Sequence, residues 1–102
     1  MKTDLYPSEI TFRDPYQDLI AGCIRGDHRA QLGIYKGYYK PMYNTSLRIL
    51  KDSGEAELIM QESFLFAFEN IETFRGNMSF TEWLRSIVVK RSNDAMRMGE
   101  GE

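Results

Sequence analysis

Two short segments of this chain carry side chains that could recognise a partner. The first, EAELIMQESF at residues 55–64, spaces three glutamates and a glutamine along a helical pattern, so its polar groups could bind cations of another molecule. The second, FRGNMSFTEWL at residues 74–84, is a glycine-containing loop that leads into a helix start. No histidine, nucleophile or phosphate-binding loop accompanies the carboxylates. The pattern therefore predicts binding, and we expect no catalytic residue and no enzyme.

Composition limits the classes of protein to which the chain could belong. With 102 residues, of which 42% are hydrophobic, it can form one domain with one core. Its longest apolar run, Phe64–Phe68, has five residues, far below the roughly 20 of a membrane span. A single cysteine and a single histidine offer no internal disulfide and no zinc site. We expect a cytoplasmic protein with no metal and no cofactor.

The charges are unevenly distributed along the chain. The net charge is −2, which argues against a protein that coats nucleic acid by electrostatics alone. Residues 1–74 hold eight Lys or Arg and eleven Asp or Glu, whereas residues 75–97 hold five Lys or Arg and only two acidic residues. An acidic body with a basic C-terminal part suggests two surfaces with different partners.

Helical periodicity runs through most of the chain and predicts an all-α fold, a compact bundle of about four helices. Residues 1–13 are expected to form an N-terminal arm, residues 14–97 the helical domain, and residues 98–102 a linker or chain end. The first helix should start with Asp14 as its cap and the second with Asp27, with a kink or brief break at Pro41. A turn at 51–54 should precede a third helix over 55–71, and a fourth should run over 80–97 from a Ser79–Glu82 capping box.

The third helix has an unusual outer face. Its inward arc is apolar, but the opposite arc mixes Leu58, Leu65 and Phe66 with glutamates. Two explanations stay open at this point. The first helix could cover these apolar side chains, or they could form an acidic-rimmed patch for a partner helix.

The fourth helix has an apolar side and a polar side. Trp83 lies on the apolar side and is expected in the core in preference to a stacking role, and Arg91 is expected to pair with Asp94. The other side carries a basic stripe in which no acidic side chain is expected; it consists of Ser86, Lys90, Asn93 and Arg97. Such a stripe is either a solvated face or a track for phosphates and bases.

These segments, together with YYKPMYNTSLRIL at residues 38–50, resemble region 2 of the bacterial extracytoplasmic-function sigma factors. The resemblance covers residues 16–97 and implies a domain of transcription initiation that binds RNA polymerase. The third helix would dock on the clamp helices of the polymerase β′ subunit. The contact candidates carried over are Glu55, Glu57, Leu58, Gln61 and Glu62. Leu58 stands where the family usually has an aspartate, which removes one charge-assisted contact.

The resemblance also implies promoter DNA as a partner. The loop would capture a flipped base of the −10 element on the non-template strand, and the fourth helix would follow the backbone. The DNA-binding candidates are Arg75, Gly76, Asn77, Met78, Ser79, Arg85, Ser86, Lys90, Asn93 and Arg97. The family usually has asparagine at position 90 and an apolar residue at position 93, so promoter preference is open.

An alternative interpretation is a sigma-like interaction module that occupies the clamp or an anti-sigma factor without recognising a promoter. An anti-sigma factor is a further expected partner, and the free domain is expected to be monomeric. In the family, a helix-turn-helix domain that reads the −35 element follows region 2, and the sequence leaves open whether one follows here.

Overall fold

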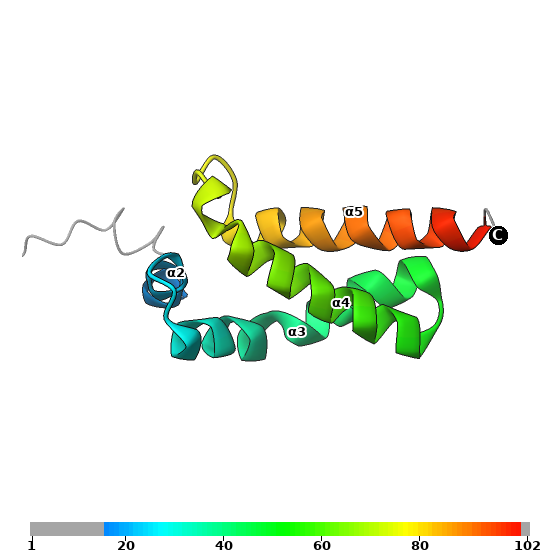
Figure 1. Ribbon diagram of the computed structural model, residues 1–102, viewed down its shortest axis with the longest axis horizontal. Helices are drawn as coiled ribbons and strands as arrows, with labels where there is room; N and C mark the ends of the chain where they lie inside the picture. The colour runs from blue at the N-terminus through cyan, green and yellow to red at the C-terminus, as the bar shows by residue number, and fades with distance from the viewer. Residues whose placement is uncertain (1–15, 101–102) are drawn as a thin grey trace, which may run out of the picture.

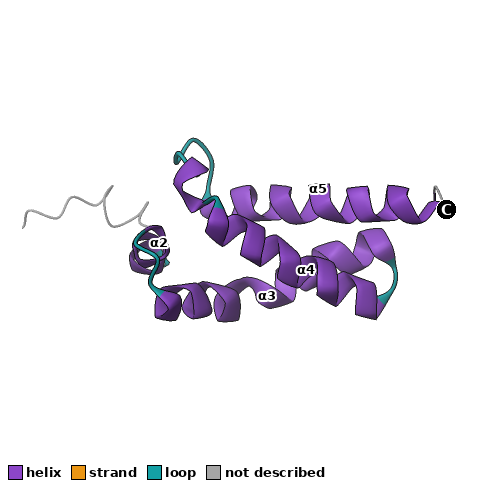
Figure 2. Cartoon of the chain, in the orientation of Figure 1, coloured by secondary structure: helices purple, strands orange, loops and turns teal. Residues whose placement is uncertain are grey.

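Helices form the regular secondary structure of residues 16–100, the part of the chain that the computed structural model describes (Figure 2). In chain order they are α2 (Gln17–Ile24), α3 (His28–Leu50), α4 (Ser53–Glu69), the short 3-10 helix η1 (Ile71–Thr73) and α5 (Phe80–Glu100). The all-α fold with four helices is confirmed. The expected arm at 1–13 and the expected cap Asp14 lie outside the described residues.

The three long helices pack against one another, with α4 passing in front of the second half of α3, and α2 lies against the first half of α3 (Figure 1). Each helix places one apolar side in a shared core, which explains the periodicity of the sequence. The core side chains are Ile20, Cys23, Ala30, Ile34, Tyr38, Met42, Met60, Phe64, Ala67, Ile71, Phe80, Leu84 and Val88.

Small polar residues form a buried contact between α5 and the C-terminal part of α3. Ser46 on α3 and Ser92 on α5 are fully buried, and the Ser92 hydroxyl donates a hydrogen bond to the Ser46 hydroxyl at 2.9 Å. Near the other end, the Thr81 hydroxyl donates to the Tyr38 hydroxyl at 3.2 Å. These two bonds satisfy polar groups that would otherwise be costly to bury.

The helix α3 is continuous from His28 to Leu50, with Pro41 inside it, so of the kink or brief break expected there the break does not occur. The hydrogen bond that proline removes would have ended on the carbonyl of Gly37. Gly37 is exposed, so water can satisfy that carbonyl without interrupting the helix. The start of the helix follows the prediction, because the Asp27 carboxylate accepts a hydrogen bond from the Arg29 N–H at 2.9 Å.

The bounds expected for α4 and α5, the third and fourth helices of the sequence prediction, need correction. The segment 51–54 is only partly a turn: Lys51 takes the left-handed conformation at φ 60°, and α4 then begins at Ser53. The Asp52 carboxylate caps α4 by accepting from the Glu55 N–H at 2.8 Å. The helix ends at Glu69, with Ile71 in η1, and α5 continues three residues beyond the expected Arg97.

Candidate functional site

The outer face of α4 holds all five residues that the resemblance assigns to polymerase binding. Glu55, Glu57, Leu58 and Gln61 are exposed, and Glu62 is half-buried. The Gln61 amide lies 3.5 Å from the Glu57 carboxylate, one helical turn earlier. These side chains thus lie together on one accessible helix. Leu58 is the aliphatic one among them.

The helix α2 does not cover the apolar side chains of this face, so the explanation that the first helix buries them is wrong. Leu58 is 54% exposed and Leu65 is 61% exposed, because α2 packs against α3 and η1 instead. Two leucines held outward on one helix present an apolar patch with an acidic surround. The other explanation, that these side chains form an acidic-rimmed patch for a partner helix, stays a prediction.

Arg91 has a different partner from the one expected. Its Nη2 lies 3.6 Å from Oε1 of Glu62 on α4, and its guanidinium lies over the Phe66 ring at 5.4 Å from the centroid. Asp94 instead binds two other side chains of α5. Arg91 and Asp94 both line a small hollow beside Phe66 of α4, but only Arg91 contacts Glu62 and the Phe66 ring. Arg91 therefore links α5 to the candidate polymerase-binding face.

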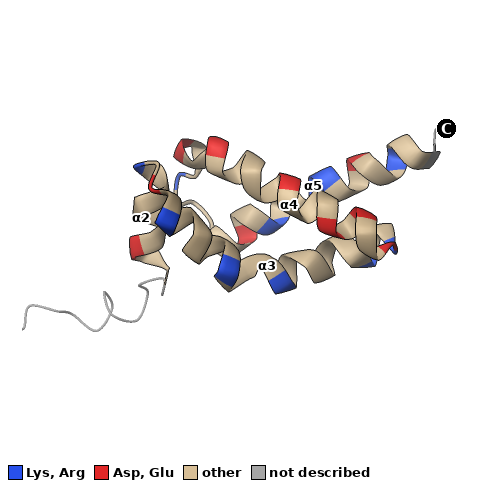
Figure 3. Cartoon of the chain, turned by 60° about the horizontal axis from the view of Figure 1, so that its bottom comes forward, with Lys and Arg blue, Asp and Glu red and all other residues tan. Residues whose placement is uncertain are grey.

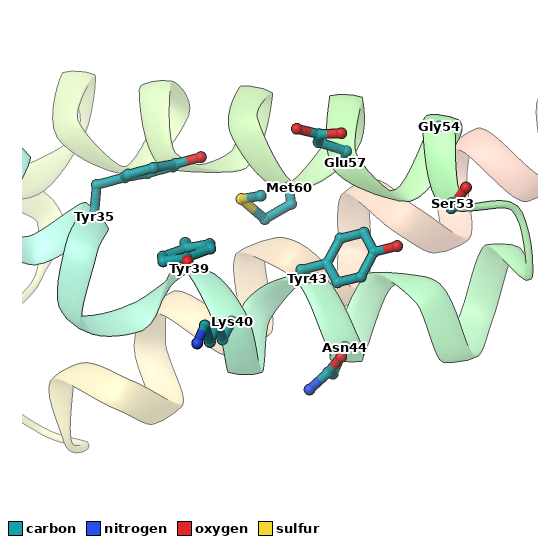
Figure 4. Close-up of a pocket in the computed structure, with 9 residues that line it drawn as sticks. All are labelled: Tyr35, Tyr39, Lys40, Tyr43, Asn44, Ser53, Gly54, Glu57 and Met60. Atoms are coloured by element: carbon teal, nitrogen blue, oxygen red, sulfur yellow. The ribbon is translucent and has the colours of Figure 1, made fainter.

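A groove between α3 and α4 adjoins this face, and sequence reasoning missed it (Figure 4). It has a volume of about 440 Å³. Tyr35 and Tyr39 stack on its α3 side with ring centroids 5.5 Å apart, and Glu57 and Met60 form its α4 side. Its other lining residues are Lys40, Tyr43, Asn44, Ser53 and Gly54. The spacing of Tyr35, Tyr39 and Tyr43, four residues apart, was the available signal.

The loop between η1 and α5 is exposed at its tip and anchored at its base. Residues 75–79 are all exposed, and Gly76 takes φ 78°, a conformation that suits glycine. At the base, the Phe74 ring packs against Phe80 at 5.5 Å and Trp83 at 5.4 Å between centroids. Trp83 is half-buried against the core, as expected. The five loop candidates, Arg75, Gly76, Asn77, Met78 and Ser79, are therefore presented together on a fixed support.

The predicted capping box fixes where α5 starts. The Ser79 hydroxyl accepts from the Glu82 N–H at 3.1 Å, and the Glu82 carboxylate accepts from the Ser79 N–H at 3.3 Å. The Ser86 hydroxyl, one turn later, donates to the Trp83 carbonyl at 2.6 Å. Arg85 is exposed close to the loop. The cap thus sets the position of the loop relative to Arg85 and Ser86 in the next turn of α5.

The basic stripe of α5 is not free of acids, which corrects the prediction. Asp94 bonds to Lys90 at 3.1 Å and to Arg97 at 2.8 Å. Hydrogen bonds from Lys90 and then Arg97 hold the pKa of the Asp94 carboxyl below its ordinary value. Asn93, in the same stripe, is half-buried. Both cations of the stripe are therefore partly neutralised within their own helix.

Two further features bear on the class of site. Among the described residues, no group of three or more His, Cys, Asp or Glu side chains could hold a metal ion. No helix between residues 16 and 100 is long and apolar enough to cross a membrane.

Comparison with known proteins identifies the family. The model of sigma-70 region 2 matches residues 34–100. The chain is 36% identical over 73 residues to the ECF RNA polymerase sigma factor SigW of Bacillus subtilis, a match that covers 72% of this chain and 39% of that protein. It is 30% identical over 78 residues to the RNA polymerase sigma-H factor of Pseudomonas aeruginosa, covering 76% of this chain and 40% of the relative.

The chain spans about two fifths of the length of these curated relatives. No solved structure matches it significantly. The family match covers most of α3 and all of α4, the loop and α5, which carry every candidate residue described above. The chain therefore belongs to the sigma-70 region 2 family.

Proposed function

We propose that this sigma factor domain docks on the clamp helices of the RNA polymerase β′ subunit through α4 and captures an unpaired base of the −10 promoter element with the loop at 74–79. The observation that carries the docking proposal is the uncovered outer face of α4, where Leu58 and Leu65 remain more than half exposed among carboxylates. Such a face suits a partner helix that offers both apolar contact and basic groups. No catalytic step is involved.

The groove between α3 and α4 extends this docking surface. Glu57 belongs both to the groove and to the polar part of the α4 face. Stacked tyrosines supply rigid apolar area at low conformational cost, which makes them good anchors for a partner side chain. We assign Tyr39 of the stacked pair, and Tyr43, which lines the same groove, to the clamp-binding surface.

The loop and the start of α5 support the promoter part of the proposal. Extruding a base from a duplex costs a few kcal/mol, and stacking returns about 1–3 kcal/mol per base. A five-residue exposed loop can thus hold a base that is already unpaired, while opening of the duplex requires the polymerase. The packing of Phe74 against Phe80 and Trp83 at the base of the loop keeps the loop pre-organised for capture.

Charge reversal on α5 tests the promoter part. Lys90→Glu combined with Arg97→Glu should strongly weaken binding to a single-stranded −10 oligonucleotide and leave clamp binding unchanged. Arg48→Glu combined with Lys51→Glu changes the net charge equally at sites on α3 and its C-terminal cap, and should have a much smaller effect. Equal loss in both double variants, or in neither, would contradict a specific role for α5.

A second candidate function has one observation in its favour. Because Asp94 already pairs with Lys90 and Arg97, the stripe offers less free positive charge than its sequence suggests. A sigma-like module that binds the clamp or an anti-sigma factor without promoter recognition would retain clamp binding in all of these variants. It would show no preference for a −10 sequence over a scrambled oligonucleotide, which separates it from the first proposal.

A further inference from the structure

The surface of α3 carries only positive formal charge. No Asp or Glu occurs between His28 and Leu50, whereas Arg29, Lys36, Lys40 and Arg48 are all exposed. Five of its residues follow a heptad spacing of i, i+3, i+7, i+10 and i+14, which places them along one side of a helix. We call them the basic heptad face: Arg29, Leu32, Lys36, Tyr39 and Tyr43. Leu32 is 52% exposed, so this face also includes uncovered apolar area.

The surface of α4 has the opposite charge and the same spacing. No Lys or Arg occurs between Ser53 and Glu69. Its outer side carries the acidic heptad face, which consists of Glu55, Leu58, Glu62, Leu65 and Glu69. Figure 3 shows the resulting separation, with basic residues along α3 and acidic residues along α4. The net charge of the chain does not reveal this separation, because the positive charges of α3 and the negative charges of α4 nearly cancel.

The two faces match each other at their first four positions. Charged residues come first and third in both faces, with cations on α3 and carboxylates on α4, and apolar residues come second and fourth in both. Helices with such patterns pair through apolar contacts, with opposite charges setting the choice of partner. We propose that the basic heptad face of α3 docks the acidic heptad face of α4 from a second copy of this chain.

The contact would be weak and open-ended. One helix face against another buries less area than the roughly 1,200 Å² typical of stable interfaces, so association belongs to the transient class. Each copy offers both faces, and the contact is heterologous, so copies add in sequence and need not stop at two. The groove beside Tyr39 and Tyr43 can receive an aliphatic side chain from the docked helix.

Self-association would have a regulatory consequence, which rests on the proposed function. The acidic heptad face contains Leu58 and Glu62, which we assign to clamp binding. A copy whose α4 is docked on a neighbour could not engage polymerase through the same residues. High concentrations of free domain would then limit clamp binding.

Sedimentation velocity on the full 102-residue chain tests the proposal without polymerase, so its failure and failure of the clamp proposal are separate results. The average mass should rise with concentration between about 10 µM and about 1 mM, the range of weak association. A variant with Arg29→Glu and Lys36→Glu should associate about tenfold more weakly, since two attractions become repulsions. A variant with Glu55→Lys and Glu62→Lys reverses the two carboxylates that oppose these cations and should be equally impaired; because it also removes the Glu62–Arg91 contact, circular dichroism must show that it is folded.

Mixing the two impaired variants gives the sharpest outcome. Each repels itself, but the acidic α3 face of one matches the basic α4 face of the other, so the mixture should recover association. Arg48→Glu with Lys51→Glu has the net charge of the first variant with both heptad faces intact, and should associate like the unaltered chain. A mass that stays monomeric in the unaltered chain up to about 1 mM overturns the proposal. A mixture of the two variants that remains monomeric also overturns the proposal. Normal association of the variant with Arg29→Glu and Lys36→Glu overturns it as well.

Discussion

Asp94 offers the most quantitative test of the promoter-binding stripe. Its carboxylate lies 3.1 Å from Lys90 Nζ and 2.8 Å from Arg97 Nη2, while the side chains of those two cations are 74% and 70% exposed. They are therefore accessible to DNA, but each must leave Asp94 to bind a phosphate. Replacing Asp94 with asparagine keeps the side-chain shape and removes the competing charge. We predict that Asp94→Asn binds a single-stranded −10 oligonucleotide more tightly than the unaltered domain.

The size of the effect follows from counterion release. Each phosphate contact on a single strand contributes about −0.7 to the slope of log K against log salt concentration. Freeing two cations should therefore steepen this slope by at most about 1.4, and freeing one by about 0.7. Fluorescence anisotropy at several salt concentrations measures both the affinity and the slope. Glu69→Gln, which removes one carboxylate on the outer face of α4, is the control for net charge and should leave the slope unchanged.

The lowered pKa of Asp94 gives the prediction a pH dependence with a definite sign. Because the folded-state pKa lies below the unfolded value, the ion pairs are fully present above the ordinary carboxyl range and are lost as pH falls through the folded pKa. The difference between Asp94→Asn and the unaltered domain should thus be constant at neutral pH and should shrink under acid conditions. Equal affinities and equal salt slopes at neutral pH would refute the reasoning that Asp94 competes with phosphate.

Three other predictions concern the docking face and the core. Leu58→Ala should lower affinity for a β′ clamp-helix fragment by severalfold in calorimetry, because it removes exposed apolar area that the docking face offers to the partner helix. Phe80→Ala should lower the free energy of unfolding by about 3–5 kcal/mol in urea denaturation, since Phe80 is 2% exposed and packs on the rings of Tyr38, Phe74 and Trp83. Cys23 should react with a thiol reagent far more slowly in the folded than in the unfolded chain, because burial, and then Asp27, raises the pKa of its thiol.

Features determined within one helix were predictable from the sequence. The Ser79–Glu82 capping box and the Asp27 cap involve residues at most three positions apart, and both occur as expected. The inward arc of α4 was also predictable, since Ala56, Met60 and Phe64 recur at helical spacing and are all buried.

Features that depend on two helices were not predictable in the same way. The spacing of Arg91 and Asp94 suggested a local pair, but a carboxylate and an aromatic ring on α4 compete for Arg91 once α4 and α5 pack. The groove between α3 and α4 likewise exists only after both helices are placed. The start of α4 was missed because Ser53 and Gly54 favour turns, whereas the Asp52 cap outweighs that preference.

Binding to an isolated β′ clamp-helix fragment tests the central claim most directly, because it isolates the outer face of α4 from DNA. Docking through α4 predicts saturable binding by the unaltered domain, loss of binding in Gln61→Ala and Glu62→Lys, and retention in Arg48→Glu, which lies on α3. Circular dichroism of each variant establishes that it is folded. No binding by the folded unaltered domain, or equal binding by all three variants, would contradict docking through α4.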